Sequence, residues 1–384
     1  MTTIGLRRMR PRDPAEDHRA ASPLELLFDL VFVVAVGFAA SNLHEIETEG
    51  HVTSAILSYA FVFFAIWWAW INFTWFATSF DTDDWLYRVT TFVQMAGVLV
   101  LAAGVGPAMR GEAPVVVVIG YVVMRLALVA QWVRAAVSAP RYRSTATTYV
   151  LGVVVVQALW VALLAVPPAA RPIVIPVLIL LELLVPVVAE SRGETTPWHT
   201  HHIAERYSLF TLIVLGEGLV ASANAVIDGL RHAEHLGPLL TLAAGGLVIV
   251  AGLWWIYFSR EQHEHIRGLP SALVFGYGHY LVFAAAAALP AGIEVAVSAD
   301  AGQADLSHAS VAATIAVPVA LFVGAVWALA LRPSLAPRWN VAVVLLTLVI
   351  VASTAVPAAS LAVTAVAVVG IVVVLEVADR SPVA

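Results

Sequence analysis

The sequence predicts an all-α, polytopic membrane helix bundle of about 12 transmembrane helices, arranged as two parallel six-helix repeats. Three observations predict this fold class. The 384 residues are 61% hydrophobic and 12% charged, whereas a soluble domain averages about 45–50% apolar and 25% charged residues. Apolar runs of about 20 residues, the length that crosses a bilayer, recur along the chain. Related sequence blocks occur in both halves.

Charged, proline-rich or glycine-rich breaks separate the expected spans. Strands of a membrane barrel would alternate apolar and polar residues, whereas segment 115–123, VVVVIGYVV, is apolar on both faces. Helices are therefore favoured. The division between the last two spans rests on segment 354–360 alone. In chain order we expect spans at residues 23–43, 55–78, 88–108, 114–137, 148–166, 172–190, 203–226, 238–258, 271–291, 309–331, 339–356 and 358–378.

The positive-inside rule predicts the orientation of these spans. Residues 1–21 are polar, carry both signs of charge, and are followed by an apolar run without a cleavage site of small residues; we interpret them as a cytoplasmic tail. With this tail inside, most of the 20 basic residues, all of them arginine, fall in cytoplasmic segments. The sequence therefore predicts a multi-pass protein of the inner (cytoplasmic) cell membrane with both termini in the cytoplasm.

The two halves of the chain resemble each other. IWWAWINF at 66–73 corresponds to LWWIYF at 253–258, and GFAASN at 37–42 corresponds to GLVASAN at 218–224. The tryptophans of these blocks lie toward the inner ends of the second spans, where aromatic belts are common. Because six spans separate each matched pair, both copies enter the membrane in the same direction, as in parallel repeats. We expect one repeat at 22–192 and the other at 193–384.

The first span begins with two carboxylates, of which the deeper one lacks a local partner. Ser22 and Glu25 fit the N-cap and N3 positions, so Glu25 can bond back to the Ser22 amide in a capping box. Asp29 lies about 6 Å deeper, where no free helix-end amide remains. Because a charge inside a bilayer costs several kcal/mol, we expect another helix to supply its partner, with the helices of Arg125 and Glu217 as candidates. For Arg125, an ion pair that merely fixes helix packing is the alternative.

A second polar cluster opens the seventh expected span. Glu205 corresponds to the capping glutamate of the first span, with Arg206 beside it. His201 lies four residues before Glu205, and His202 four before Arg206, so each pair shares a helix face. Together with His199 these histidines are weak candidates for metal ligands, because their spacing fits no strict metal signature. A capped polar cluster at the membrane interface is the alternative.

Three further polar residues lie within expected spans. Glu217 is twelve residues beyond Glu205, hence about 18 Å deeper, and two glycines flank it, which allows close approach of a helix or an ion. Gln94 and His279 occupy matching places in the third spans and could line a polar path. A buried histidine with satisfied partners is the alternative for His279, and a structural role remains equally open for Glu217.

Two segments carry a family resemblance. SPLELLFDLVFVVAV at 22–36 and HHIAERYSLFTLIVLGEGLVAS at 201–222 resemble the bacterial low temperature requirement protein A (LtrA) family. That family matches an E-L-x-F-D-L-V-F-V pattern, here from Glu25 to Val33, with H-x-x-E-R-x-x-L-x-x-I-V-L-G-E, here from His202 to Glu217. The resemblance extends over nearly the whole chain. It implies a multi-span integral membrane protein and carries no established reaction.

Parallel repeats with buried charges predict a transporter or channel for a small ion or solute. An intramembrane enzyme acting on a lipid or isoprenoid through the histidine cluster is one alternative, and a noncatalytic membrane component for growth in the cold is another. The absence of cysteine excludes thiolate chemistry, and no basic stripe indicates nucleic acid. We expect the bilayer and the ion or solute as partners and no cofactor, and leave homo-oligomerisation open. The expected path residues are Asp29, Gln94, Arg125, Glu205, Arg206, Glu217 and His279.

Overall fold

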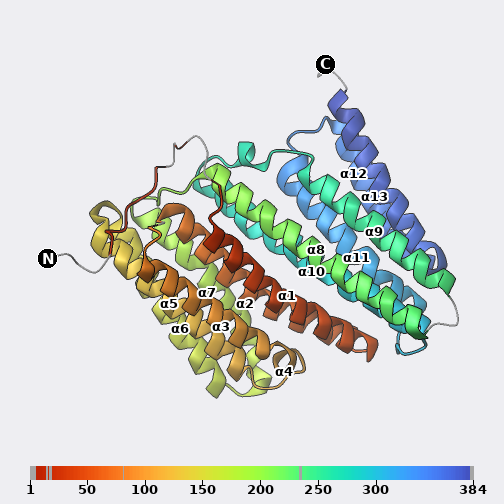
Figure 1. Cartoon of the computed structure of the whole chain (residues 1–384), viewed down its shortest axis with the longest axis horizontal. Helices are drawn as coiled ribbons and strands as arrows, with labels where there is room; N and C mark the ends of the chain where they lie inside the picture. The colour runs from red at the N-terminus through yellow and green to blue at the C-terminus, as the bar shows by residue number, and fades with distance from the viewer. Residues whose placement is uncertain (1–5, 14–15, 17–19, 81, 233–235, 381–384) are drawn as a thin grey trace. The chain divides into compact units, whose positions relative to one another are not determined.

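The computed structural model describes residues 6–13, 16, 20–80, 82–232 and 236–380, and these residues form helices and connecting segments without a strand (Figure 1). This confirms the all-α prediction. The helices are α1 (Pro23–Thr48), α2 (Val52–Ser79), α3 (Trp85–Ala103), α4 (Val105–Met109), α5 (Val115–Ser138), α6 (Arg143–Ala162), α7 (Arg171–Arg192), α8 (Thr200–His232), α9 (Leu236–Phe258), α10 (Gly268–Asp300), α11 (His308–Val326), α12 (Pro337–Ala352) and α13 (Pro357–Arg380).

Each of the twelve expected segments falls on a helix of the structure. Within the described residues, 11 helices are long and apolar enough to cross a membrane. The helices outside this set are the short α4 and the long α8, which lies where we expect the seventh span and carries Glu205, Arg206 and Glu217. The uncertain division near the C-terminus is real, because Ser353–Ala355 forms a short 3₁₀ turn between α12 and α13.

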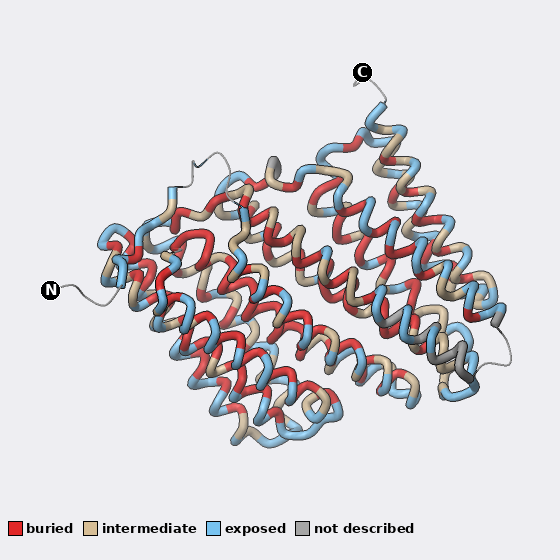
Figure 2. The backbone as a smooth tube through the Cα atoms, in the orientation of Figure 1, coloured by how far each residue is buried: buried red, intermediate tan, exposed pale blue. Residues whose placement is uncertain are grey.

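Exposed residues recur along the described helices (Figure 2), and many of them carry large apolar side chains. Leu57, Val137, Ile173 and Val366 are each between 67% and 74% exposed. A soluble monomer rarely leaves such contiguous apolar surface in water, whereas lipid tails solvate it and helices satisfy their own backbone groups. The chain is therefore a polytopic membrane protein.

Several helix boundaries follow from local chemistry. The Asp84 carboxylate accepts from the Tyr87 amide at the start of α3, and Ser307 caps α11 by accepting from the Ser310 amide at 3.1 Å. Such caps satisfy amides that have no partner inside the helix. After α10, Gly302 adopts φ +70°, a left-handed conformation that ends helices readily in glycine.

The first of two compact units comprises Met1–Ala35 and Phe64–Arg206. In it α3 packs on α5, α5 on α6, and α6 on α7. Aromatic contacts tie further segments together: the ring centroids of Phe28 and Phe73 lie 3.9 Å apart, and Trp132 stacks on Tyr149 at 4.1 Å. This unit holds the first turns of α1 and α8 and the last part of α2, where the buried charges gather.

The second unit comprises Val36–Phe63 and Tyr207–Ala384. Here α10 packs on α9 and α11, and α13 packs on α9, α11 and α12. The α10–α11 contact is close, since a Cβ atom at Gly292 would lie 2.1 Å from the Thr314 carbonyl oxygen. These units describe contacts; the repeats at 22–192 and 193–384 concern internal duplication and stay a prediction.

Candidate functional site

Four ionisable side chains of the first unit form one buried group, which we call the charged cluster: Glu25, Asp29, His202 and Arg206. Arg206 donates to both oxygens of Asp29, from Nη2 to Oδ1 at 2.6 Å and from Nε to Oδ2 at 3.3 Å. Its Nη1 lies 3.0 Å from Glu25 Oε1, and His202 Nε2 lies 3.2 Å from the same oxygen. One arginine thus faces two carboxylates.

Local sequence spacing builds the charged cluster. Glu25 and Asp29 are four residues apart on α1, and His202 and Arg206 are four apart on α8, so each pair projects from one helix face. The start of α1 is fixed by a capping box: the Ser22 amide donates to Glu25 Oε2 at 2.8 Å, and the Glu25 amide donates to Ser22 Oγ at 3.3 Å. Glu25 therefore caps α1 with one oxygen and faces Arg206 with the other.

The charged cluster is sealed from solvent. Asp29, His202 and Arg206 are 0% exposed and Glu25 is 2% exposed. Trp70 of α2 donates its indole N–H to Asp29 Oδ1 at 2.7 Å. Two carboxylates and one histidine thus surround one guanidinium in a site closed to solvent.

His199, which directly precedes α8, makes hydrogen bonds with neighbouring backbone and side-chain groups. His199 Nε2 lies 2.7 Å from the Glu16 carbonyl oxygen, its amide donates to Thr78 Oγ1 at 3.2 Å, and its Nδ1 accepts from the His202 amide at 3.2 Å. Among the described residues, no group of three or more His, Asp or Glu side chains is placed to hold a metal ion. The weak metal candidates His199, His201 and His202 therefore gain no support.

A second buried ion pair joins Arg125 of α5 to Glu182 of α7, with Arg125 Nη2 donating to Glu182 Oε2 at 2.9 Å. The sequence favoured Asp29 or Glu217 as the partner of Arg125, and the structure corrects this. The two Glu182 oxygens also accept from side chains of α2, α5 and α6 at 2.9–3.2 Å: Trp68, Tyr121, Gln157 and Trp160. This pair is balanced in charge, and its carboxylate is saturated with donors.

Gln94 belongs to a polar network of its own between α3 and α5. Its Nε2 donates to Gln131 Oε1 at 3.1 Å, and Gln131 Nε2 in turn donates to Thr90 Oγ1 at 3.0 Å. The amides satisfy each other, as buried polar groups usually do. This network accounts for Gln94 without a ligand.

Two expected site residues lie in the second unit. His279 is 1% exposed; its Nε2 lies 3.0 Å from the Tyr257 hydroxyl and its Nδ1 lies 2.8 Å from the Phe275 carbonyl oxygen. It is thus a satisfied buried histidine. Glu217 reaches toward α1, because a Cβ at Gly37 would lie 3.1 Å from Glu217 Oε1. The small residue at position 37 leaves room for this carboxylate.

The structure thus assembles part of the expected path. It joins Asp29 and Arg206 and adds Glu25, which the sequence assigned to capping alone. Glu205 directly precedes Arg206 in the sequence. Its buried Oε2 has no hydrogen-bond partner among the described residues. Sequence reasoning missed the indole donors of α2, Trp68 and Trp70, because tryptophans near a helix end are typical of an interfacial belt.

Comparisons with known proteins relate nearly all of this chain to one family. The family model described as bacterial low temperature requirement A protein (LtrA) matches residues 20–375. An uncharacterized protein of Rhizobium meliloti (strain 1021) is 28% identical over 257 residues, which cover 65% of this chain and 60% of that relative. The matched part therefore spans less than two thirds of the relative's length. The family match includes both the α1 and the α8 members of the charged cluster.

Proposed function

The chain belongs to the bacterial low temperature requirement A (LtrA) family, and we propose that it is a transporter or channel for a small ion or solute. The charged cluster of Glu25, Asp29, His202 and Arg206 forms part of the path. Its two buried carboxylates favour a cation, including the proton, over an anion. The path runs through a molecule built as two parallel six-helix repeats in the inner (cytoplasmic) membrane, with both termini in the cytoplasm.

The observation that carries this proposal is that two buried carboxylates converge on one guanidinium, with a histidine beside one of them. Burying a charged group costs several kcal/mol, and an ion pair that served packing alone needs one carboxylate for one arginine. Here both Glu25 and Asp29 approach the same guanidinium. Carboxylate oxygens can exchange a bound cation or proton, and the imidazole of His202 lies 3.2 Å from Glu25 as a further polar group of the site.

The Arg125–Glu182 pair shows the contrast within the same unit. It combines one positive with one negative charge, and five donors from three helices converge on the carboxylate. Such a saturated pair fixes helices in register and leaves no acceptor for an ion. We therefore assign Arg125 to packing and remove it, with Gln94 and His279, from the proposed path. Glu205 and Glu217 stay in it, since neither has its charge balanced by a recorded ion pair among the described residues.

Flux measurements on the purified protein in liposomes test the proposal. Gradients of H⁺, Na⁺ and K⁺ are imposed in turn, with Cl⁻ as the anion comparison. We expect cation flux that Glu25→Gln or Asp29→Asn lowers at least about tenfold, the scale of one lost charge-assisted contact. Glu194→Gln, which neutralises an exposed carboxylate of the same unit, is the matched control. Absence of flux under every gradient, or equal flux in all variants, overturns the proposal.

A further inference from the structure

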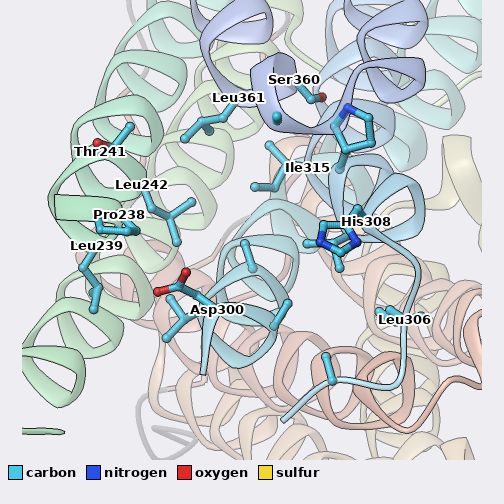
Figure 3. Close-up of a pocket in the computed structure, with 18 residues that line it drawn as sticks. Pro238, Leu239, Thr241, Leu242, Asp300, Leu306, His308, Ile315, Ser360 and Leu361 are labelled. Carbon is cyan, nitrogen blue, oxygen red and sulfur yellow. The ribbon is translucent and has the colours of Figure 1, made fainter. Parts of the chain in front are cut away.

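The second unit contains a cavity of about 750 Å³ among the ends of α9, α10, α11 and α13 (Figure 3). This volume is within the range of small-molecule sites, about 300–1,000 Å³. The cavity is far along the chain from the charged cluster and shares no residue with it. Most of its walls are apolar; Leu239, Leu242, Ile315 and Leu361 line it among others.

Asp300 is the acidic residue of the lining and ends α10. No hydrogen bond or ion pair of its carboxylate is recorded within the described part of the chain. Its position is electrostatically unfavourable, because the C-terminal end of a helix carries partial negative charge and favours cations. In Figure 3 the carboxylate is turned toward the side chains of α9. Asp300 is exposed, so its carboxylate is accessible to a ligand and gives the cavity affinity for positive charge.

The hydroxyl groups of the lining bond to the chain itself, so Asp300 is the charged group that a ligand in the cavity would meet. Thr241 Oγ1 donates to the Gly237 carbonyl oxygen at 2.9 Å, and Ser360 Oγ lies 2.8 Å from Ser353 Oγ, so both hydroxyls are engaged by the chain itself. His308 is the first residue of α11 and lies at the N-terminal end of that helix. The cavity therefore combines one negative charge with largely apolar walls.

This combination selects the chemical class of the ligand. A small inorganic cation binds through several oxygen ligands that replace its hydration shell, and one carboxylate among leucine and isoleucine side chains does not supply them. An organic ammonium ion places its charge at Asp300 and its alkyl groups against Leu242 and Ile315. We propose that this cavity is a binding site for a monovalent organic cation with an apolar body. The proposal stands independently of the transport proposed above.

Equilibrium binding of tetraalkylammonium ions to the full-length protein in lipid nanodiscs tests this site. The probes are tetramethyl-, tetraethyl- and tetrabutylammonium, titrated calorimetrically, with empty nanodiscs as the blank. We expect affinity to rise with alkyl length, because each added methylene buries apolar surface. Sodium at the same ionic strength should not compete. Affinity that does not depend on alkyl length, or binding equal to that of empty nanodiscs, overturns the proposal.

Two pairs of matched variants locate the binding. Asp300→Asn should weaken tetrabutylammonium binding about tenfold or more, since it removes a charged contact, whereas Asp305→Asn, in the following loop and outside the lining, should change it less than about twofold. Leu242→Ala should weaken binding several-fold, and Leu247→Ala, on the same helix but outside the lining, should not. Thermal unfolding of each variant verifies the fold. Equal affinities within either pair contradict the proposed site.

Discussion

Arg206 of α8 donates to Asp29 of α1 at 2.6 Å, and so joins residues 177 positions apart in the chain. The first helix of the protein is thereby tied to a helix from the second half of the sequence. Because Glu25 approaches the same guanidinium at 3.0 Å, Arg206 is the residue on which the charge balance of the cluster depends.

Removal of Arg206 should be among the most damaging single changes in the protein. Arg206→Met leaves two buried carboxylates without their cation, and breaking a buried ion pair from one side costs about 3–5 kcal/mol. We expect a large fall in the thermal unfolding midpoint of the detergent-solubilised protein. Asp29→Asn should cost less, because Arg206 keeps Glu25 as its partner.

An exposed ion pair supplies the control for this prediction. Arg141 pairs with Glu194 on the surface of the same unit, and exposed pairs contribute about 0–1 kcal/mol. Arg141→Met should therefore barely move the midpoint. A midpoint for Arg206→Met as high as that for Arg141→Met would show that the buried contact contributes little.

A double-mutant cycle should separate the Arg125–Glu182 pair from its neighbours. Glu182→Gln keeps the shape of the side chain but turns one acceptor oxygen into a donor and leaves Arg125 charged and unbalanced, so we expect a loss of about 3–5 kcal/mol. In the Arg125→Met/Glu182→Gln double variant, the arginine that Glu182→Gln leaves without its carboxylate is removed as well. We expect the double variant to lose less than the sum of the two single variants, by about 0.5–3 kcal/mol. Strict additivity in unfolding measurements would contradict a direct pair.

The helices could be predicted from the sequence because apolar runs of spanning length and their proline, glycine and charged breaks are local features. The need of Asp29 for a partner was equally predictable, since a carboxylate one turn inside a helix has no free amide nearby. The identity of that partner could not be predicted from the sequence. Helical periodicity shows that His202 and Arg206 share a face, but it does not show which helices pack together. The sequence predicted the helix of Arg125 or that of Glu217 as the source of the partner, and the partner is Arg206, on the same helix as Glu217.

Asp84 should make the stability of the first unit sensitive to acid. Burial raises the pKa of this carboxyl, but hydrogen bonds from Arg134 and from the amides of Tyr87 and Arg7 outweigh it and hold the pKa below the ordinary value of 3.8. A carboxyl with a lowered pKa in the fold contributes stability above its unfolded pKa and loses that contribution as pH falls through the folded value. The contribution is therefore complete at neutral pH and declines below about pH 4.

The measurement is the unfolding midpoint of wild type and Asp84→Asn between pH 7 and pH 3. We expect a clear difference at pH 7, because the variant loses the charge that Arg134 contacts, and a smaller difference at pH 3. Glu112→Gln, at an exposed carboxylate between α4 and α5, is the control for the loss of one negative charge at neutral pH. A difference between wild type and Asp84→Asn that grows on acidification would contradict a lowered pKa at this carboxyl.

Gly120 should not tolerate a methyl group. A Cβ there would lie 2.4 Å from the Leu101 amide nitrogen and 2.6 Å from the Gly97 carbonyl oxygen, and backbone atoms of α3 cannot move aside as a side chain can. Overpacking of this kind costs about 1–3 kcal/mol. Gly324→Ala is the control, because nothing lies within 4 Å of its Cβ position and alanine favours a helix over glycine. Gly120→Ala should lower the unfolding midpoint, and Gly324→Ala should leave or raise it.

The proposed membrane orientation can be tested directly because the chain has no cysteine, so one introduced cysteine is the single labelling site. With both termini in the cytoplasm, Gln303→Cys between α10 and α11 lies outside, and Ser191→Cys at the end of α7 lies inside. We expect a membrane-impermeant maleimide to label Gln303→Cys in intact cells and Ser191→Cys only after permeabilisation. The opposite pattern would place the termini outside and reverse the positive-inside assignment. Because Asp300 lies three residues before Gln303 in the chain, the cavity that Asp300 lines would then lie at the cytoplasmic face.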